Sequence, residues 1–165
     1  MGEKPYKRPE SVLVVVYTLN GEVLMLRRVC PNRFWQSVTG SLEWGESAVQ
    51  AARRELYEET GIMAGDGLID LHHQVTFPIL PAWRSRYAPS AHANTEHWFA
   101  LALPGRRLPR LQPDEHSAYR WVSCRQALRL ATSWTNRKAI RYLLGPVNTD
   151  RIGPAEAIFP SSKAE

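Results

Sequence analysis

Hydrophobic and polar positions along the chain follow patterns that favour strands interleaved with helices. The β-branched run at residues 11–17 is typical of a buried strand, and Asn20 followed by Gly21 predicts a tight turn into a second strand at residues 23–28. Residues 34–42 lead into the first helix. Further strands are expected at residues 68–80, 96–103 and 118–122. This order fits several α/β or α+β folds, and periodicity alone leaves the choice open.

The first predicted helix follows residue 46. Ser47 is a candidate N-cap, and Ala48, Ala52 and Leu56 recur at four-residue intervals to form a narrow apolar stripe. Small alanines on this stripe allow the helix to lie close to a sheet, and Gly61 supplies the left-handed residue that ends the helix. Two more helices are expected at residues 124–132 and 135–144, with Ser123 and Thr135 as candidate caps.

Three carboxylates lie where they destabilise the first helix. Glu55, Glu58 and Glu59 fall within one turn, since side chains three and four positions apart are neighbours. Glu58 and Glu59 are near the negative end of the helix dipole, which disfavours each carboxylate by ~0.3–1 kcal/mol. An acidic helix is most often a solvated surface, here with Arg54 offsetting Glu58. A divalent cation would instead turn the repulsion into ligation, because hard oxygen ligands are those that Mg²⁺ selects.

Two glycines, Gly40 and Gly45, flank the loop before this helix. Glycine permits both a positive φ and close approach of the backbone to a ligand. An ordinary turn would explain the pair, whereas their register with the carboxylates favours a loop that holds a diphosphate. Glu46 can either support the metal-binding carboxylates or form an ion pair with Arg54.

One spacing unites these features. Seven fixed identities in residues 40–62 follow the pattern GX5EX7REUXEEXGU, where U is an aliphatic residue. Each identity has a chance of roughly one in ten to one in twenty by average usage, so chance agreement is negligible. The chain therefore resembles the Nudix hydrolase family at every defining position. The resemblance implies the Nudix fold, an α/β/α sandwich with a mixed β-sheet, and Mg²⁺-dependent cleavage of a nucleoside diphosphate linked to another group.

Shorter motifs extend the resemblance over residues 6–144. They are YKRP, FWQSVTGS, RYAP, NTEHWF, EHSAYRW and SWTNRKAI. Together they are similar to the bacterial members of the family that release pyrophosphate from 7,8-dihydroneopterin triphosphate in folate synthesis. The same members are often described as acting on dATP, so a nucleoside triphosphate or the 5′ end of RNA remains the alternative substrate. A binding module without catalysis is disfavoured, because it has no need to retain a costly carboxylate cluster.

The resemblance also implies roles for the carboxylates. Glu55 and Glu59 match ligands for Mg²⁺, for which Mn²⁺ can substitute, and Glu58 matches a residue that binds a further ion or acts through water. Glu115 matches a further metal ligand or general base, although the residues alone would leave it an ordinary loop carboxylate beside Asp114. The catalytic set implied is thus Glu58, Glu59 and Glu115. The histidines show no spacing typical of metal ligation, and none is assigned to the site.

Four other residues match substrate contacts of the family. Lys7 and Arg28 can hold phosphate by charge, and Thr39 and Ser133 offer hydroxyl groups. Each has a competing explanation. Lys7 and Arg28 can be ordinary surface charges, Thr39 an ordinary strand residue, and Ser133 a hydroxyl at the start of a helix. Several aromatic side chains can stack on a flat pterin or purine ring, although most aromatic residues belong to cores. They are Trp35, Phe77, Trp83, Tyr87 and Trp98.

Composition adds expectations about organisation and surroundings. The 165 residues predict one Nudix domain at 1–145 and a loosely packed or disordered tail at 146–165. The net charge of +5 comes from basic residues scattered along the sequence, so we interpret it as attraction for a small anionic substrate, with no stable nucleic-acid partner. Two cysteines, Cys30 and Cys124, without metal spacing, and the lack of an apolar signal or membrane segment, favour a cytoplasmic monomer or homodimer.

Overall fold

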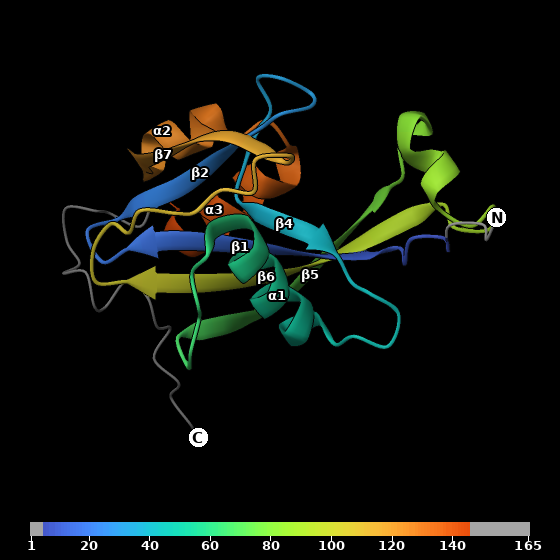
Figure 1. The fold of residues 1–165 in the computed structure, drawn as a ribbon, viewed down its shortest axis with the longest axis horizontal. Helices are drawn as coiled ribbons and strands as arrows, with labels where there is room; N and C mark the ends of the chain where they lie inside the picture. The colour runs from blue at the N-terminus through green and yellow to red at the C-terminus, as the bar shows by residue number, and fades with distance from the viewer. Residues whose placement is uncertain (1–4, 146–165) are drawn as a thin grey trace.

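A seven-stranded mixed β-sheet organises the fold of residues 5–145, the part of the chain that the computed structural model describes (Figure 1). The path of hydrogen-bonded strands is β3-β2-β1-β6-β5, while β4 pairs with β1 and β7 pairs with β2. The strands are β1 (Glu10–Thr18), β2 (Glu22–Arg28), β3 (Trp35–Gln36), β4 (Val38–Ser41), β5 (Leu68–Pro78), β6 (Ala93–Leu103) and β7 (His116–Ser123). The helices are α1 (Ala48–Thr60), the 3₁₀ helix η1 (Pro81–Arg86), α2 (Cys124–Leu130) and α3 (Trp134–Leu144).

The central strand β1 is buried on both faces, which explains its β-branched run. It pairs with β6 in parallel and with β2 and β4 in antiparallel orientation. Val12 belongs to the core cluster that contains Leu56 of α1, whereas Leu13 belongs to the cluster that contains Ala127 of α2 and Ile140 of α3. Helices therefore cover both faces of the sheet, and the predicted α/β/α sandwich with a mixed sheet is confirmed.

Helix α1 begins and ends where the sequence predicts. The Ser47 hydroxyl accepts a hydrogen bond from the Gln50 backbone N–H at 3.3 Å, and the Gln50 side-chain oxygen accepts one from the Ser47 N–H at 2.9 Å. This reciprocal pair is a capping box. Gly61 ends the helix with φ 70°, and Ala52 and Leu56 are fully buried against the sheet. The helix is thus fixed at both ends and along one face, which determines where its carboxylates point.

Several predicted boundaries differ from the observed ones; β7 begins at His116 instead of residue 118, and α2 ends at Leu130 instead of residue 132. β5 ends at Pro78, and β6 begins at Ala93, because the ladder between the two strands continues to that pair of residues. Ser133, and not Thr135, is the N-cap of α3: the Ser133 hydroxyl accepts the capping hydrogen bond at 3.1 Å. Thr135 was the wrong choice because its side chain is buried and hydrogen bonds to Glu96 in the core.

The predicted tail at residues 146–165 lies outside the described residues. Within residues 5–145, no helix combines the length and the apolar character needed to span a membrane.

Candidate active site

Gly40 lets the carboxylate of Glu55 lie directly against the backbone of β4. A Cβ atom on Gly40 would overlap the Glu55 carboxyl group, so a larger residue here would force that carboxyl group or the strand to move. The second loop glycine, Gly45, has a different reason for its identity, since its φ is +81° with open space around it. The two glycines therefore shape the loop in different ways, one by close approach and one by backbone conformation.

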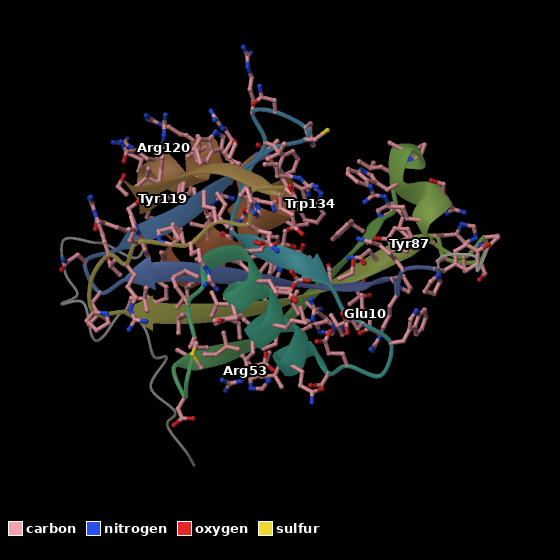
Figure 2. The ribbon with its side chains drawn as sticks, in the orientation of Figure 1. Glu10, Arg53, Tyr87, Tyr119, Arg120 and Trp134 are labelled. Atoms are coloured by element: carbon pink, nitrogen blue, oxygen red, sulfur yellow. The ribbon has the colours of Figure 1, made fainter. Side chains whose placement is uncertain are left out.

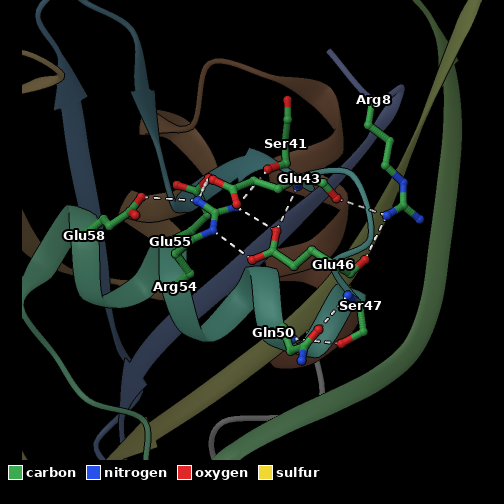
Figure 3. A network of polar contacts seen from close by, with 9 residues as sticks. All are labelled: Arg8, Ser41, Glu43, Glu46, Ser47, Gln50, Arg54, Glu55 and Glu58. Atoms are coloured by element: carbon green, nitrogen blue, oxygen red, sulfur yellow. Dashed lines mark hydrogen bonds and ion pairs between the residues drawn. The ribbon is translucent and has the colours of Figure 1, made fainter. Parts of the chain in front are cut away.

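Arg54 is the centre of a polar network on the exposed side of α1 (Figure 3). Its guanidinium group donates to both carboxylate oxygens of Glu46, at 2.8 and 2.9 Å. It also donates to Glu55 at 2.8 Å, to Glu58 at 3.2 Å and to the backbone carbonyl of Ser41 at 3.0 Å. The predicted pairs of Arg54 with Glu46 and with Glu58 are both present. The bidentate hydrogen bond from Arg54 holds the pKa of Glu46 below its ordinary value.

Arg8 ties the loop before α1 to the start of β1 (Figure 3). Its guanidinium group donates to the backbone carbonyls of Glu43 at 3.2 Å and Glu46 at 2.8 Å, and to the carboxylate of Glu10 at 2.7 Å. The Glu43 N–H in turn donates to the Glu46 carboxylate at 2.9 Å. The loop therefore reaches α1 in one conformation, which helps to hold Arg54 beside Glu55.

Glu59 is a buried carboxylate with an unpartnered oxygen. Its exposure is 2 %, and its Oε2 has no hydrogen-bond partner among the described residues. Burial raises the pKa of Glu59 well above its ordinary value, and the nearby charges of Glu55 and Glu115 raise it further. Burial also raises the pKa of Glu55 to about 7, against the hydrogen bond from Arg54. The two carboxyl groups resist ionisation mainly because burial disfavours their charged forms, and Arg54 at Glu55 and Arg28 near Glu59 offset this only in part.

His116 completes the group of possible metal ligands around Glu59. Ligand atoms of Glu59, Glu115 and His116 all lie within 4.8 Å of one another. The Nε2 atom of His116 lies 4.0 Å from Oε2 of Glu59 and 3.3 Å from Nε2 of Gln36. Burial lowers the pKa of His116 to about 4, and Arg28 lowers it further, so the imidazole is neutral at pH 7.

The residues of this cluster fit a divalent cation. A cation would satisfy the buried, unpartnered oxygen of Glu59 and remove the repulsion that raises its pKa. The donors of Glu55, Glu59 and Glu115 are carboxylate oxygens, the hard ligands that Mg²⁺ and Mn²⁺ accept. Glu58 lies at the rim of the cluster, where its side chain is 49 % exposed and pairs with Arg54.

Basic side chains lie beside the carboxylates. Burial lowers the pKa of Lys7. The positive charges of Arg86 and Arg28 lower this pKa further, whereas the negative charges of Glu55 and Glu115 raise it. Lys7 is held there by its backbone N–H, which donates to the Arg86 carbonyl at 2.8 Å. None of the three cations forms an ion pair with a carboxylate in residues 5–145. They are therefore available to an anionic ligand bound next to Glu55 and Glu115.

The aromatic candidates divide between core and surface. Trp98 is fully buried and stacks on His73, so it belongs to the core. Trp83 of η1 is partly exposed and lies between two arginines, with Arg28 5.9 Å and Arg86 4.8 Å from its ring centroid. Trp83 is thus placed next to the basic cluster.

The two predicted hydroxyl contacts are both engaged within the protein. Thr39 donates to the backbone carbonyl of Val12 at 2.8 Å. Ser133 caps α3, and Asn136 of the same turn accepts a hydrogen bond from the Ser37 N–H at 2.7 Å. This bond ties the start of α3 to the turn between β3 and β4, close in sequence to Thr39. Thr39 is a neighbour of Glu59. A hydrogen bond from the Thr39 backbone to the Glu59 carboxylate partly opposes the rise in the Glu59 pKa.

Sequence reasoning brought Glu55, Glu59 and Glu115 together but missed His116, Gln36 and Arg86. His116 directly follows Glu115, and this adjacency was the signal that could have suggested it. Gln36 carried no signal, because its contact with His116 joins residues 80 positions apart. Arg86 lies in the RYAP motif, yet its approach to Lys7 depends on how η1 packs against the N-terminal segment.

Comparison with known proteins identifies the family of this chain. The family model described as "NUDIX domain" matches residues 7–143, and the chain therefore belongs to the Nudix hydrolase family. The chain is 49% identical over 144 residues to the dihydroneopterin triphosphate diphosphatase of Escherichia coli strain K12, covering 85% of this chain and 95% of that protein. It is 38% identical to the protein of the same name from Haemophilus influenzae, covering 84% and 89%. The solved E. coli dihydroneopterin triphosphate pyrophosphohydrolase superposes with a TM-score of 0.77 at 48% identity, over 84% of this chain and 97% of that one.

Proposed function

We propose that this protein hydrolyses 7,8-dihydroneopterin triphosphate to the monophosphate and pyrophosphate with the help of Mg²⁺. The observation that carries the proposal is the buried, unpartnered carboxylate of Glu59 beside Glu55 and Glu115, with Lys7 and Arg28 nearby. A divalent cation and a polyphosphate together would neutralise both groups of charges. The relatives named for this substrate supply its identity.

Each part of the site has a proposed task. Glu55, Glu59 and Glu115 would hold Mg²⁺, or Mn²⁺ in its place, and Lys7 and Arg28 would hold the phosphate chain. When bound, the ion supplies positive charge at the phosphate oxygens and at the attacking water.

The proton of that water needs an acceptor. The exposed carboxylates of Glu58 and Glu115 are the two candidates, because Glu59 is enclosed and is assigned to the metal. Arg54 is assigned a positioning role, since it donates a hydrogen bond to the Glu55 carboxylate at 2.8 Å.

The pterin preference is the finer part of the proposal. We expect kcat/KM to be higher for dihydroneopterin triphosphate than for dATP, measured side by side at one Mg²⁺ concentration. Ser133→Ala should narrow this ratio by a few-fold, because one neutral hydrogen bond is worth ~0.5–1.5 kcal/mol. Equal efficiency of the wild type on both substrates would favour the alternative, a nucleoside triphosphate pyrophosphohydrolase.

Ser133 is also a helix cap, so its variant needs a matched control. Ser123 caps α2 by the same type of hydrogen bond, from Gln126 N–H at 3.2 Å. Each Ser→Ala change should cost about 0.5–2 kcal/mol of stability. If Ser123→Ala narrows the substrate ratio as much as Ser133→Ala does, the effect comes from lost capping, and the substrate role of Ser133 is wrong.

We further propose that the enzyme works on small triphosphates in the cytoplasm, as a monomer or homodimer. Cys30 and Cys124 are both free thiols, which suits a reducing compartment.

A further inference from the structure

A basic groove follows the outer edge of β7, and we refer to it as the β7 groove. It consists of two adjoining hollows of about 450 and 220 Å³ that share Arg120. Arg106 and Arg107 also line the first hollow, and Arg129 lines the second; no acidic residue lines either of them. Figure 2 shows Arg120 and its neighbour Tyr119 on β7, on the other side of the molecule from Tyr87 of the η1 segment.

Three of these arginines have no counter-charge in the described part of the chain. Arg107 and Arg129 form no hydrogen bond or ion pair through their side chains there, and Arg120 only lies over the ring of Trp35, 5.1 Å from its centroid. Arg106 differs, since it is paired with Glu22. Like charges gathered in this way repel one another, and an anionic ligand would relieve the repulsion.

The floor of the groove offers aromatic and backbone groups. Tyr119 and Trp121 line the larger hollow and are partly exposed. The Trp121 indole N–H donates to the Arg107 carbonyl at 3.0 Å, which anchors the loop after β6 against the strand. Among the described strands β7 pairs only with β2, so its outer backbone edge is open. A positively charged groove with aromatic side chains along its wall is the combination that binds single-stranded nucleic acid.

We propose that the β7 groove binds a single-stranded nucleic acid through its backbone phosphates, independently of the hydrolytic site. The charges are spread over two hollows, which matches a chain of phosphodiesters better than one small anion. The groove begins at Tyr119, three residues or roughly 10 Å along β7 from His116, and continues away from the carboxylates to Val122. This proposal departs from the expectation of no nucleic-acid partner, because the fold gathers arginines that are scattered in the sequence.

The test is the salt dependence of binding. Binding of a labelled oligonucleotide of about ten nucleotides is measured by fluorescence anisotropy at several salt concentrations. The oligonucleotide carries a 5′-hydroxyl end, so it offers no phosphoanhydride to hydrolyse, and binding is measured apart from the proposed reaction. With three phosphate contacts, log K should fall against log[salt] with a slope of about −2, since each contact on a single strand contributes about −0.7. The double variant Arg120→Gln/Arg129→Gln should lose about 1.4 of that slope.

Arg53→Gln is the matched control, because Arg53 is an exposed arginine on α1, outside the groove (Figure 2). It should keep the wild-type slope, and every variant should keep the wild-type kcat/KM on a small triphosphate. Arg107→Gln tests the groove from the neighbouring loop if the double variant folds poorly. Three results would overturn the proposal: no salt-dependent binding, equal loss in Arg53→Gln, or equally tight binding of a poly-glutamate peptide, which would indicate an acidic protein partner.

Discussion

Replacing Glu59 with Gln should lower kcat by about two to four orders of magnitude while the fold survives. Gln keeps the shape of the side chain but removes the charge that a divalent cation needs at the most enclosed position of the cluster, where exposure is 2 %. Steady-state hydrolysis of dihydroneopterin triphosphate over a range of Mg²⁺ concentrations measures the loss. Raising the Mg²⁺ concentration should not restore the wild-type rate.

The same variant should be more stable than the wild type when a chelator removes divalent ions. The folded-state pKa of Glu59 lies above its unfolded value, so the folded protein binds the proton more tightly and loses stability as the pH rises above about 4.5. Gln cannot ionise and avoids this loss. The melting temperature of Glu59→Gln should therefore exceed that of the wild type at pH 8, and the difference should shrink towards pH 5.

Glu43→Gln serves as the control for both measurements, because Glu43 lies on the exposed loop before α1 and its carboxylate forms no hydrogen bond within residues 5–145. Glu43→Gln should match the wild type in its rate of hydrolysis and in its melting temperature at pH 8 and at pH 5. Full activity of Glu59→Gln, or of the wild type in excess chelator, would show that the proposed metal site is wrong.

Replacing Gly40 with Ala should also cost most of the activity, although the change adds only one methyl group. That group would overlap the carboxylate of Glu55, which is held from its other side by Arg54 at 2.8 Å. Glu55 must then leave its position or β4 must shift. A misplacement of about 1 Å in a catalytic site costs about a hundredfold in rate. The hydrolytic activity and the affinity for Mn²⁺ should fall together. Electron paramagnetic resonance measures the Mn²⁺ affinity.

Gly105→Ala is the control for a glycine without close neighbours, since a Cβ atom there meets no other atom within 4 Å. It should leave activity unchanged. If Gly40→Ala is as active as Gly105→Ala, the contact between Gly40 and Glu55 has no role in catalysis.

Local features of the site could be predicted from sequence because they depend on helix geometry. The cap at Ser47, the end at Gly61 and the grouping of Glu55 with Glu59 all follow from spacing within one helix. Cap assignment failed for α3, where Ser133 and Thr135 offer the same hydroxyl chemistry two residues apart. Burial of Thr135 decided between them, and burial is a tertiary property.

Adjacency to Glu115 suggests that His116 is near the site, but its position beside Glu59 depends on strand register and could not be predicted. His116 pairs with Arg28 across a shift in the ladder between β2 and β7, and no local pattern encodes that irregularity. The arginines of the β7 groove were overlooked for a similar reason. They come from a loop, a strand and a helix, and only the folded chain brings them to one edge.

Phosphorus NMR of the products shows which anhydride bond of the triphosphate the enzyme cleaves. Wild-type enzyme, Mg²⁺ and dihydroneopterin triphosphate are mixed, and the first-formed phosphorus species are followed with time. If the carboxylate cluster and the basic residues hold the phosphate chain as proposed, the monophosphate and pyrophosphate appear together from the start. Orthophosphate and a diphosphate as the primary products would show that cleavage occurs at the other anhydride bond, and the proposed binding of the phosphate chain would then be wrong.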